Sequence, residues 1–267
     1  MPVWLLFFCL CSFPAWAVDC PALSIDEEVE IETIHDGDTL RLTDGRRVRF
    51  VAINAPELSQ EDRAAQALAT EATDAAREFL SDTKIVQLHY GERKVDRYGR
   101  LLAHVYHPRR GSLEANLVAL GLAFPIAIPP DVSLSACLAN LADRARENNL
   151  GVWNEAYWAP LAADNLSAIE PGFRRVCGNI AKVDRTGALW LELQGDVVIR
   201  INRDDWRYFA GSAFDLAQAE QWLGRTIELW AWLQDRRAQT ELMQRGFKRW
   251  VVPVRSPYVM RWASSCP

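Results

Sequence analysis

Hydrophobic and polar residues alternate along several short stretches of the chain, with the period of two that half-buried β-strands show. Asp44-Gly45 is typical of a hairpin turn, and Pro56 is expected to end the strand that follows this turn. The first half of the chain is therefore expected to consist mainly of strands, at 29–34, 39–42, 47–53, 84–90 and 101–106.

Other stretches are rich in helix-favouring residues and predict helices at 62–80, 113–121 and 134–149, with Gly151 as a suitable stop. The polar interval 91–100 is expected to be a loop. Five strands with a helix inserted after the third match a Greek-key barrel of the OB type. We therefore predict a mainly β fold with helices (α+β), although alternating strands and turns also fit other small barrels.

The periodicity fades after Trp158, and two prolines mark the stretch up to Gly172. We interpret 159–172 as a linker between a first domain at 18–158 and a second at 173–267. The second segment repeats the earlier order of three strands, a helix and two strands, which predicts a second, smaller OB-like domain. Its expected strands lie at 178–183, 191–193, 197–201, 226–233 and 249–254, and its expected helix at 214–223.

The composition is globular, with 267 residues of which 49% are hydrophobic and 24% charged. The net charge of −5 argues weakly against a nucleic-acid partner. However, residues 171–267 hold 15 Lys+Arg against 10 Asp+Glu and seven of the eleven tryptophans. A basic, aromatic OB-like domain suits single-strand binding through backbone attraction and base stacking. The alternative is that most of these tryptophans fill a small barrel.

The chain begins with an apolar run that ends in the small-residue pattern Ala15-Trp16-Ala17. This arrangement is typical of an export signal at 1–17 that is cut after Ala17, and it is too short to span a bilayer. An uncleaved anchor is the competing interpretation, because no Lys or Arg precedes the apolar run. We expect an exported protein, periplasmic or secreted, with no membrane partner once the signal is removed.

Six cysteines are present, and two of them would leave with the signal. The remaining four are an even number in an expected export product, so disulfides are plausible. Four cysteines allow three connectivities. We favour Cys20–Cys137 and Cys177–Cys266, because each pair would then close within one predicted domain.

Three polar clusters carry candidate chemistry: Asp-Gly-Asp-Thr at 36–39, Arg49 with Asn-Ala-Pro-Glu at 54–57, and Asp-Arg-Tyr-Gly-Arg at 96–100. Phosphodiester hydrolysis needs cations on the phosphoryl oxygens, a carboxylate for the attacking water and often a hard metal ion. Each cluster alone also fits a plain structural role, such as a hairpin turn, a helix entry or a surface ion pair. Their combination, in this order, favours a phosphodiesterase that cuts nucleic acid.

With these clusters in register, the sequence resembles the staphylococcal nuclease family over about residues 30–155. The family resemblance implies an OB-type barrel with helices, calcium dependence, and cleavage of DNA and RNA with little sequence preference. It rests on these stretches: 34–39, Arg49, 56–57, 96–103, 117–118, 121–123 and 150–153.

The resemblance also implies roles for single residues. Arg49 and Arg100 match the two phosphate-binding arginines, and Glu57 matches the carboxylate thought to activate water. Tyr98 matches a tyrosine beside the bound nucleotide, and we expect Arg97 to contact substrate with it.

For the metal, Asp38 matches the main calcium carboxylate and Asp36 its outer partner. Ala55 would offer its backbone carbonyl. Asn54 stands where a second calcium-binding aspartate is expected, and an amide supplies an oxygen without a charge. We therefore expect one Ca²⁺ ion held with reduced affinity.

Two functions of different classes follow. One is a calcium-dependent endonuclease acting on DNA and RNA, on single-stranded or frayed regions. The other is a non-catalytic module on the same barrel that holds nucleic acid or a protein partner, with Asn54 marking the loss of the metal. Neither the oligomeric state nor a preference between DNA and RNA follows from the sequence.

Overall fold

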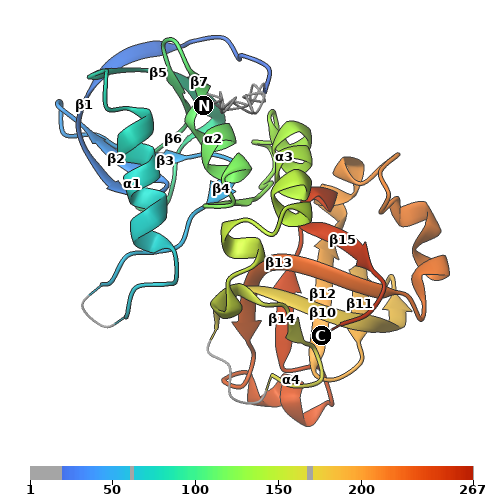
Figure 1. Cartoon of the computed structure of the whole chain (residues 1–267). Coiled ribbons are helices and arrows are strands. Elements are labelled where there is room, and N and C mark those ends of the chain that lie inside the picture. The colour runs from blue at the N-terminus through green and yellow to red at the C-terminus, as the bar shows by residue number, and fades with distance from the viewer. Residues whose placement is uncertain (1–19, 61–62, 167–170, 267) are drawn as a thin grey trace, which may run out of the picture.

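Five strands of the first half close into a barrel, as predicted. The computed structural model describes residues 20–60, 63–166 and 171–266, so the predicted signal at 1–17 lies outside the described residues. The strands run in the order β3-β2-β1-β5-β6, and a parallel pairing of β3 with β6 closes the ring (Figure 1). They are β1 (Glu27–Asp36), β2 (Thr39–Leu42), β3 (Arg47–Phe50), β5 (Ile85–Val95) and β6 (Leu101–His107).

The alternation of residues explains how the barrel presents its polar groups. On β3, Val48 and Phe50 are fully buried in the core, whereas Arg47 and Arg49 point to the other face. Two short additions accompany the barrel. β7 (Gly111–Ser112) pairs antiparallel with β6, and β4 (Ile53–Asn54) pairs with β8 (Phe124–Pro125) in a separate ladder.

The helices α1 (Ala69–Phe79) and α2 (Leu113–Ala119) pack on the first barrel, and α3 (Ser135–Glu147) packs against α2 and β8. The short 3₁₀ helices η1 (Gly151–Trp153) and η2 (Ala156–Trp158) follow. The helix expected from residue 62 begins only at Ala69, because Leu68 adopts a left-handed backbone with φ 71°. Residue 62 itself lies outside the described part. Strand β5 also continues to Val95, into the expected loop, because Val95 still pairs with Leu101 of β6.

The second half forms another closed barrel with the same connectivity, in the order β10-β11-β12-β14-β13, closed by β13 with β10. Again the third and fifth strands pair in parallel. The strands are β10 (Gly172–Asp184), β11 (Ala188–Leu193), β12 (Val197–Asn202), β13 (Thr226–Asp235) and β14 (Trp250–Pro253). The predicted order of three strands, a helical segment and two strands is therefore found.

Short elements complete this second barrel. β9 (Leu161–Ala162) pairs with β10 and β15 (Met260–Ala263) with β13, so part of the segment interpreted as a linker adds a strand to the second sheet. The helical segment expected at 214–223 is a 3₁₀ helix, η4 (Leu216–Trp222). The remaining turns of helix are η3 (Arg203–Tyr208), α4 (Thr240–Gln244) and η5 (Pro257–Val259).

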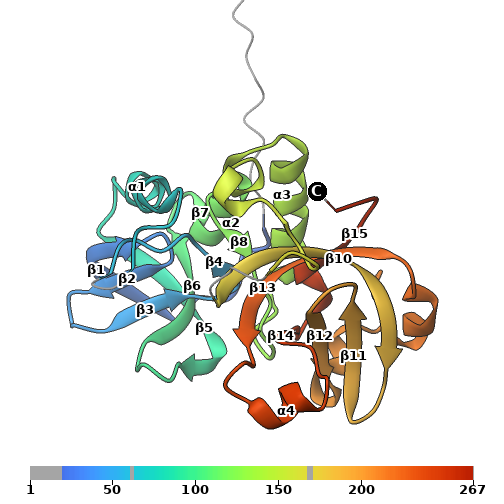
Figure 2. The same cartoon turned by 90° about the horizontal axis from the view of Figure 1, so that it is seen from below.

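The two barrels meet through aromatic side chains. Phe124 of β8 lies 5.2 Å from Phe173 of β10, measured between ring centroids. The indole N–H of Trp230 on β13 donates to the Pro125 carbonyl at 2.8 Å, and its ring lies 5.2 Å from that of Trp153. Figure 2 shows β13 beside β8 at this junction. A buried, hydrogen-bonded contact of this kind is expected to fix one barrel against the other.

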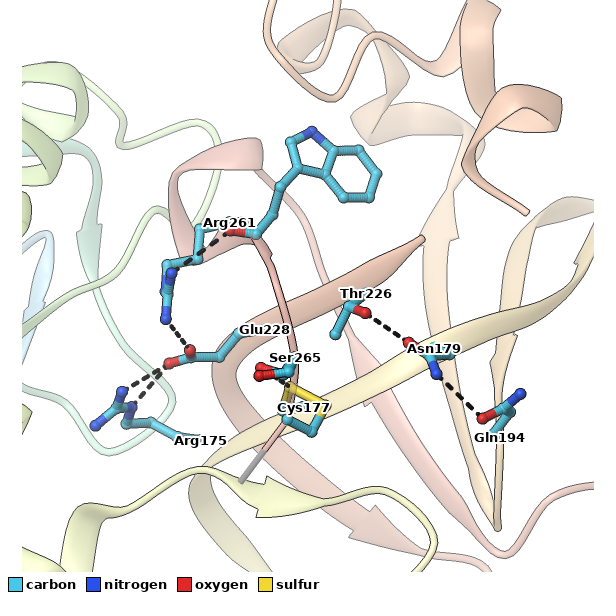
Figure 3. The surroundings of a disulfide bond; sticks show 10 residues. Arg175, Cys177, Asn179, Gln194, Thr226, Glu228, Arg261 and Ser265 are labelled. Atoms are coloured by element: carbon cyan, nitrogen blue, oxygen red, sulfur yellow. Dashed lines mark hydrogen bonds and ion pairs between the residues drawn. A yellow bond between two sulfur atoms is a disulfide. The ribbon is translucent and has the colours of Figure 1, made fainter. Parts of the chain in front are cut away.

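A buried group of charges strengthens the same junction (Figure 3). Glu228 of β13 is 2% exposed and accepts two hydrogen bonds from Arg175 of β10, at 2.8 and 3.0 Å. Its second oxygen accepts a hydrogen bond from Arg261 of β15. Arg175 also donates to the carbonyl of Trp158 at 3.1 Å, which joins the second barrel to the segment that leaves the first.

Two disulfides confirm the predicted pairing. Cys20 is bonded to Cys137 at the start of α3, and Cys177 of β10 is bonded to Cys266 near the C-terminus (Figure 3). Each closes a long loop within one half of the chain, of 117 and 89 residues. Within the described ranges, no helix is long and apolar enough to cross a membrane.

Candidate active site

The bend between β1 and β2 carries Asp38, which is only 3% exposed. One carboxylate oxygen, Oδ1, accepts from the Thr39 hydroxyl at 3.2 Å, and the other, Oδ2, accepts from the Ala55 amide at 2.8 Å. Gly37 is required before it, because a Cβ there would lie 2.7 Å from that of Ala55. Asp36 accepts a hydrogen bond from the Asp38 amide at 3.0 Å and fixes the bend.

Burial first, and the nearby Asp36 carboxylate to a smaller extent, raise the pKa of Asp38 to about 6 against the opposing effect of Arg49. Arg49 lies on β3, with its side chain 12% exposed and Nη2 at 2.9 Å from Asp38 Oδ2. Its Nη1 donates to the carbonyls of Phe50 at 2.7 Å and Ile53 at 3.0 Å. The guanidinium is thus held in one orientation by three acceptors.

Asn54 is 5% exposed, and its Oδ1 lies 3.4 Å from Nη2 of Arg49. The candidate metal ligands around Asp38 are all oxygens: two carboxylates, an amide and a backbone carbonyl. Oxygen ligands suit a hard cation such as Ca²⁺. Across the described residues, however, no three side chains of His, Cys, Asp or Glu gather as a metal-binding group. The site therefore offers few charged ligands.

Glu57 begins the segment that leads to α1. Its amide donates to the Gln66 side chain at 2.8 Å, and the Gln66 amide donates back to the Glu57 carbonyl at 2.9 Å. The carboxylate keeps contact with solvent, yet the protein packed around it raises its pKa above the usual range. The charge of Asp38 raises this pKa further, while Arg49 and Arg100 lower it. The four side chains thus lie within electrostatic reach of one another.

Arg100 stands just before β6 and is oriented by Asp96. The Arg100 Nε donates to Asp96 Oδ2 at 2.8 Å, and its amide donates to Oδ1 at 3.0 Å. The surface ion pair considered as the alternative for Arg100 is therefore present, and it leaves 25% of the arginine side chain exposed. Both Arg97 and Arg100 lie near the Tyr98 ring, with Cζ at 4.8 and 5.5 Å from its centroid. Tyr98 is 60% exposed.

Several of the candidate residues line two cavities that share Trp232 as a border. One, of about 430 Å³, is bordered by Arg49, Tyr98 and Arg100. The other, of about 810 Å³, is bordered by Asn54 and Glu57. Asp38 borders neither cavity, but its contacts with Arg49 and with the Ala55 amide join the first cluster to the second.

Several residues of this region could not be identified from the sequence pattern. Thr39 and Gln66 hold Asp38 and Glu57 by hydrogen bonds, but their residue types carry no signal for such a role. Trp232 and Arg174 of the second barrel border the cavities as well. The second half is rich in tryptophan and arginine, but only the fold places these two residues beside the first barrel.

Comparison with known proteins agrees with this geometry. The model of the protein family described as "Staphylococcal nuclease homologue" matches residues 47–155, which include Arg49, Glu57 and Arg100. A protein of Escherichia coli O157:H7 named "Uncharacterized endonuclease" is 30% identical over 139 residues, covering 51% of this chain and 83% of that protein. The chain belongs to the staphylococcal nuclease family.

Other proteins named as nucleases are similar over about half of the chain. A "Micrococcal nuclease" of Shigella flexneri is 31% identical over 159 residues, or 54% of this chain and 79% of that protein. A "Thermonuclease" of Staphylococcus intermedius is 26% identical over 130 residues, or 48% and 76%. The second barrel lies outside the residues matched by the family model.

Proposed function

We propose that this protein is an exported endonuclease that hydrolyses phosphodiester bonds of DNA and RNA. The observation that carries the proposal is the convergence of Arg49, Glu57 and Arg100 around the buried Asp38, in a chain of the staphylococcal nuclease family. Two arginines and a free carboxylate beside open cavities supply the groups that phosphoryl transfer to water requires.

Each residue has a role in the proposed reaction. Glu57 orients the attacking water and accepts its proton. Arg49 and Arg100 bind the phosphoryl oxygens and stabilise the negative charge that accumulates as water adds. Asp96 holds the Arg100 guanidinium in place, and Tyr98, with Arg97 against its ring, borders the position of the nucleotide.

For the metal we propose one Ca²⁺ ion, held by Asp38, the Asn54 amide oxygen and the Ala55 carbonyl, with Asp36 supporting Asp38. When bound, the ion would polarise the phosphate and neutralise part of its charge. Because Asn54 brings no charge, we expect weak binding.

We also propose the domain assignment and the location. Residues 18–158 would form the nuclease domain and 173–267 an accessory domain that binds nucleic acid. The protein would act in the periplasm or outside the cell once 1–17 is cleaved. Both disulfides support this location, because such bonds persist in oxidising compartments.

The test is cleavage of single- and double-stranded DNA and of RNA by the purified chain lacking 1–17, with calcium and with chelator. Activity that requires calcium and is lost in Glu57→Gln supports the proposal. Folded wild-type protein that is inactive on every substrate with each of several divalent ions contradicts it.

One observation favours a second candidate, a module that binds without cutting. Arg49 is fully engaged with Asp38 and with the carbonyls of Phe50 and Ile53, and one ligand position is an amide. A barrel that had lost the metal could keep this arrangement for stability alone. Tight binding of oligonucleotides without cleavage under any metal condition would favour this candidate.

A further inference from the structure

Trp232 is an exposed aromatic residue at the junction of the two barrels. It lies on β13, where alternation buries Ala231 and Leu233 and turns Trp232 outward, leaving it 40% exposed. Its cross-strand neighbour is Phe173 of β10, and the two rings lie edge to face with centroids 5.1 Å apart. The indole is therefore supported on one side by a buried ring and open on the other.

Trp232 belongs to the second barrel but lies beside the proposed catalytic residues of the first. Trp232 borders the cavity of about 430 Å³ together with Arg49 and Arg100. It also borders the cavity of about 810 Å³ together with Asn54 and Glu57. One side chain of the second barrel thus borders both cavities of the site. A nucleic-acid strand bound across the catalytic groups would pass Trp232.

The charges around Trp232 favour a polyanion. Arg93 and Arg97 border the first cavity and Arg174 the second, in addition to the arginines already assigned to the phosphate. The acidic residues Asp96 and Asp131 also border the first cavity, but each faces an arginine: Asp96 is bonded to Arg100, and Asp131 lies 3.7 Å from Arg93. Arg97 and Arg174 are then available to backbone phosphates.

We propose that Trp232 is a substrate-binding residue, on whose indole an unpaired base of a single-stranded nucleic acid stacks while the adjoining phosphate lies at Arg49 and Arg100. This inference rests on the proposed nuclease function and adds the substrate class. A base in a duplex is already stacked between its neighbours, so its face is not free for an indole. A sequence-tolerant preference for single strands follows, because every base has such a face.

Trp190 is the competing aromatic on the second barrel. It lies on β11, with Arg200 and Arg236 near its ring, at 5.4 and 5.5 Å from Cζ to the centroid. This arrangement suits nucleic acid too, but Trp190 borders neither of the two cavities that hold the catalytic residues. The geometry therefore favours Trp232 for the base next to the cleaved bond.

Binding without cleavage tests the inference separately from the nuclease function. The probe is a fluorescein-labelled oligothymidylate of about 12 nucleotides, titrated with the full mature chain in chelator and low salt. Trp232→Ala should weaken binding about tenfold to a hundredfold, and Trp232→Phe should restore part of it. Phe247→Ala, an exposed aromatic of the same barrel away from these cavities, is the matched control and should bind like wild type.

Equal affinity of folded Trp232→Ala and wild type, or no binding by wild type, would overturn the inference even if the enzyme cleaves DNA. If wild type binds through Trp232 but never cleaves, the inference stands and the nuclease function fails. With cleavage, Trp232→Ala should raise KM for oligonucleotides and leave kcat on a base-free aryl phosphodiester unchanged.

Photo-crosslinking gives a readout on the unmutated protein. Oligothymidylate carrying 5-iododeoxyuridine is irradiated with wild type in chelator, and the linked peptide is identified by mass spectrometry. Attachment at Trp232 is expected. Attachment confined to Trp190 or its neighbours on β11 and β12 would overturn the inference.

Discussion

The Arg49 guanidinium lies 2.9 Å from the Asp38 carboxylate, and both side chains are largely buried. The residue proposed to bind phosphate therefore also neutralises the residue proposed to bind the metal. Arg100 differs, because its partner Asp96 lies at the surface loop that precedes β6 and its side chain is 25% exposed. The two arginines share a cavity but differ in what their removal should do to the fold.

Replacing Arg100 by Ala should lower kcat about a hundredfold to a thousandfold, because one charge on the phosphoryl oxygens is lost. The midpoint of denaturant unfolding should stay close to wild type. Arg49→Ala should lower kcat as much and also destabilise the protein, by about 3–5 kcal/mol, because it leaves Asp38 buried without its partner. Arg47→Ala, on the exposed face of the same strand, is the control. Full activity in Arg100→Ala would contradict the assignment.

Adding a charge at residue 54 should strengthen metal binding. Asn54→Asp should lower the calcium concentration for half-maximal activity, on the order of tenfold, because ligand charge sets affinity at such sites. Asn54→Leu, which removes the oxygen, should raise that concentration. Calorimetric titration with calcium checks both changes independently of turnover. An unchanged calcium requirement in the two variants would exclude Asn54 as a ligand.

Breaking the buried charge group at the junction should be costly. Glu228→Gln removes the charge that faces Arg175 and Arg261 and should lower the free energy of unfolding by about 3–5 kcal/mol. Glu220→Gln is the matched control, since Glu220 is 69% exposed and pairs with Arg185 at the surface. Its effect should stay within about 1 kcal/mol. Equal, small effects of the two substitutions in guanidinium titrations would count against this account.

Acid should weaken the first barrel through Glu27. Hydrogen bonds from Arg46, and then from Tyr90, lower the pKa of Glu27 to about 2. Because the folded state holds the carboxylate charged, its contribution is present above the ordinary value of 4.5 and is lost as pH falls toward 2. Glu27→Gln should therefore destabilise the protein at pH 7 and much less at pH 3. Glu30→Gln, exposed on the same strand, controls for loss of a negative charge; a pH-independent effect at Glu27 would refute the linkage.

Much of the fold follows from local pattern, and the reasons for the exceptions are physical. Alternation on β3 places Val48 and Phe50 inside and Arg49 outside, and this needs no knowledge of the tertiary structure. By contrast, β5 continues past its apolar residues because Val95 finds a partner on β6. The pairing of the cysteines could be inferred because a bond within one domain was the simplest arrangement.

For the site, residue type and spacing were enough to select Arg49, Glu57 and Arg100 as candidates. They were not enough to select Gln66, because no motif surrounds it. Its side chain reaches the Glu57 amide only after the segment folds back. Trp232 is a stronger case. Among seven tryptophans in the second half, Trp222 and Trp250 fill the barrel, as the plainer interpretation expected, and Trp230 is buried at the junction with the first barrel. That Trp232 borders the cavities depends on how β13 is placed in the folded protein.

The parallel pairing of β3 with β6 has a consequence for how the protein gains activity. Arg49 pairs with Leu102 in that ladder, so Arg49 and Arg100 become neighbours only when strands about fifty residues apart join. Contacts so distant in sequence carry a large loop-closure cost and form slowly. The pairing of β3 with β6 both closes the barrel and brings Arg49 next to Arg100. A refolding chain should therefore regain its phosphate-binding pair at the moment the barrel shuts, with no active open intermediate on the way.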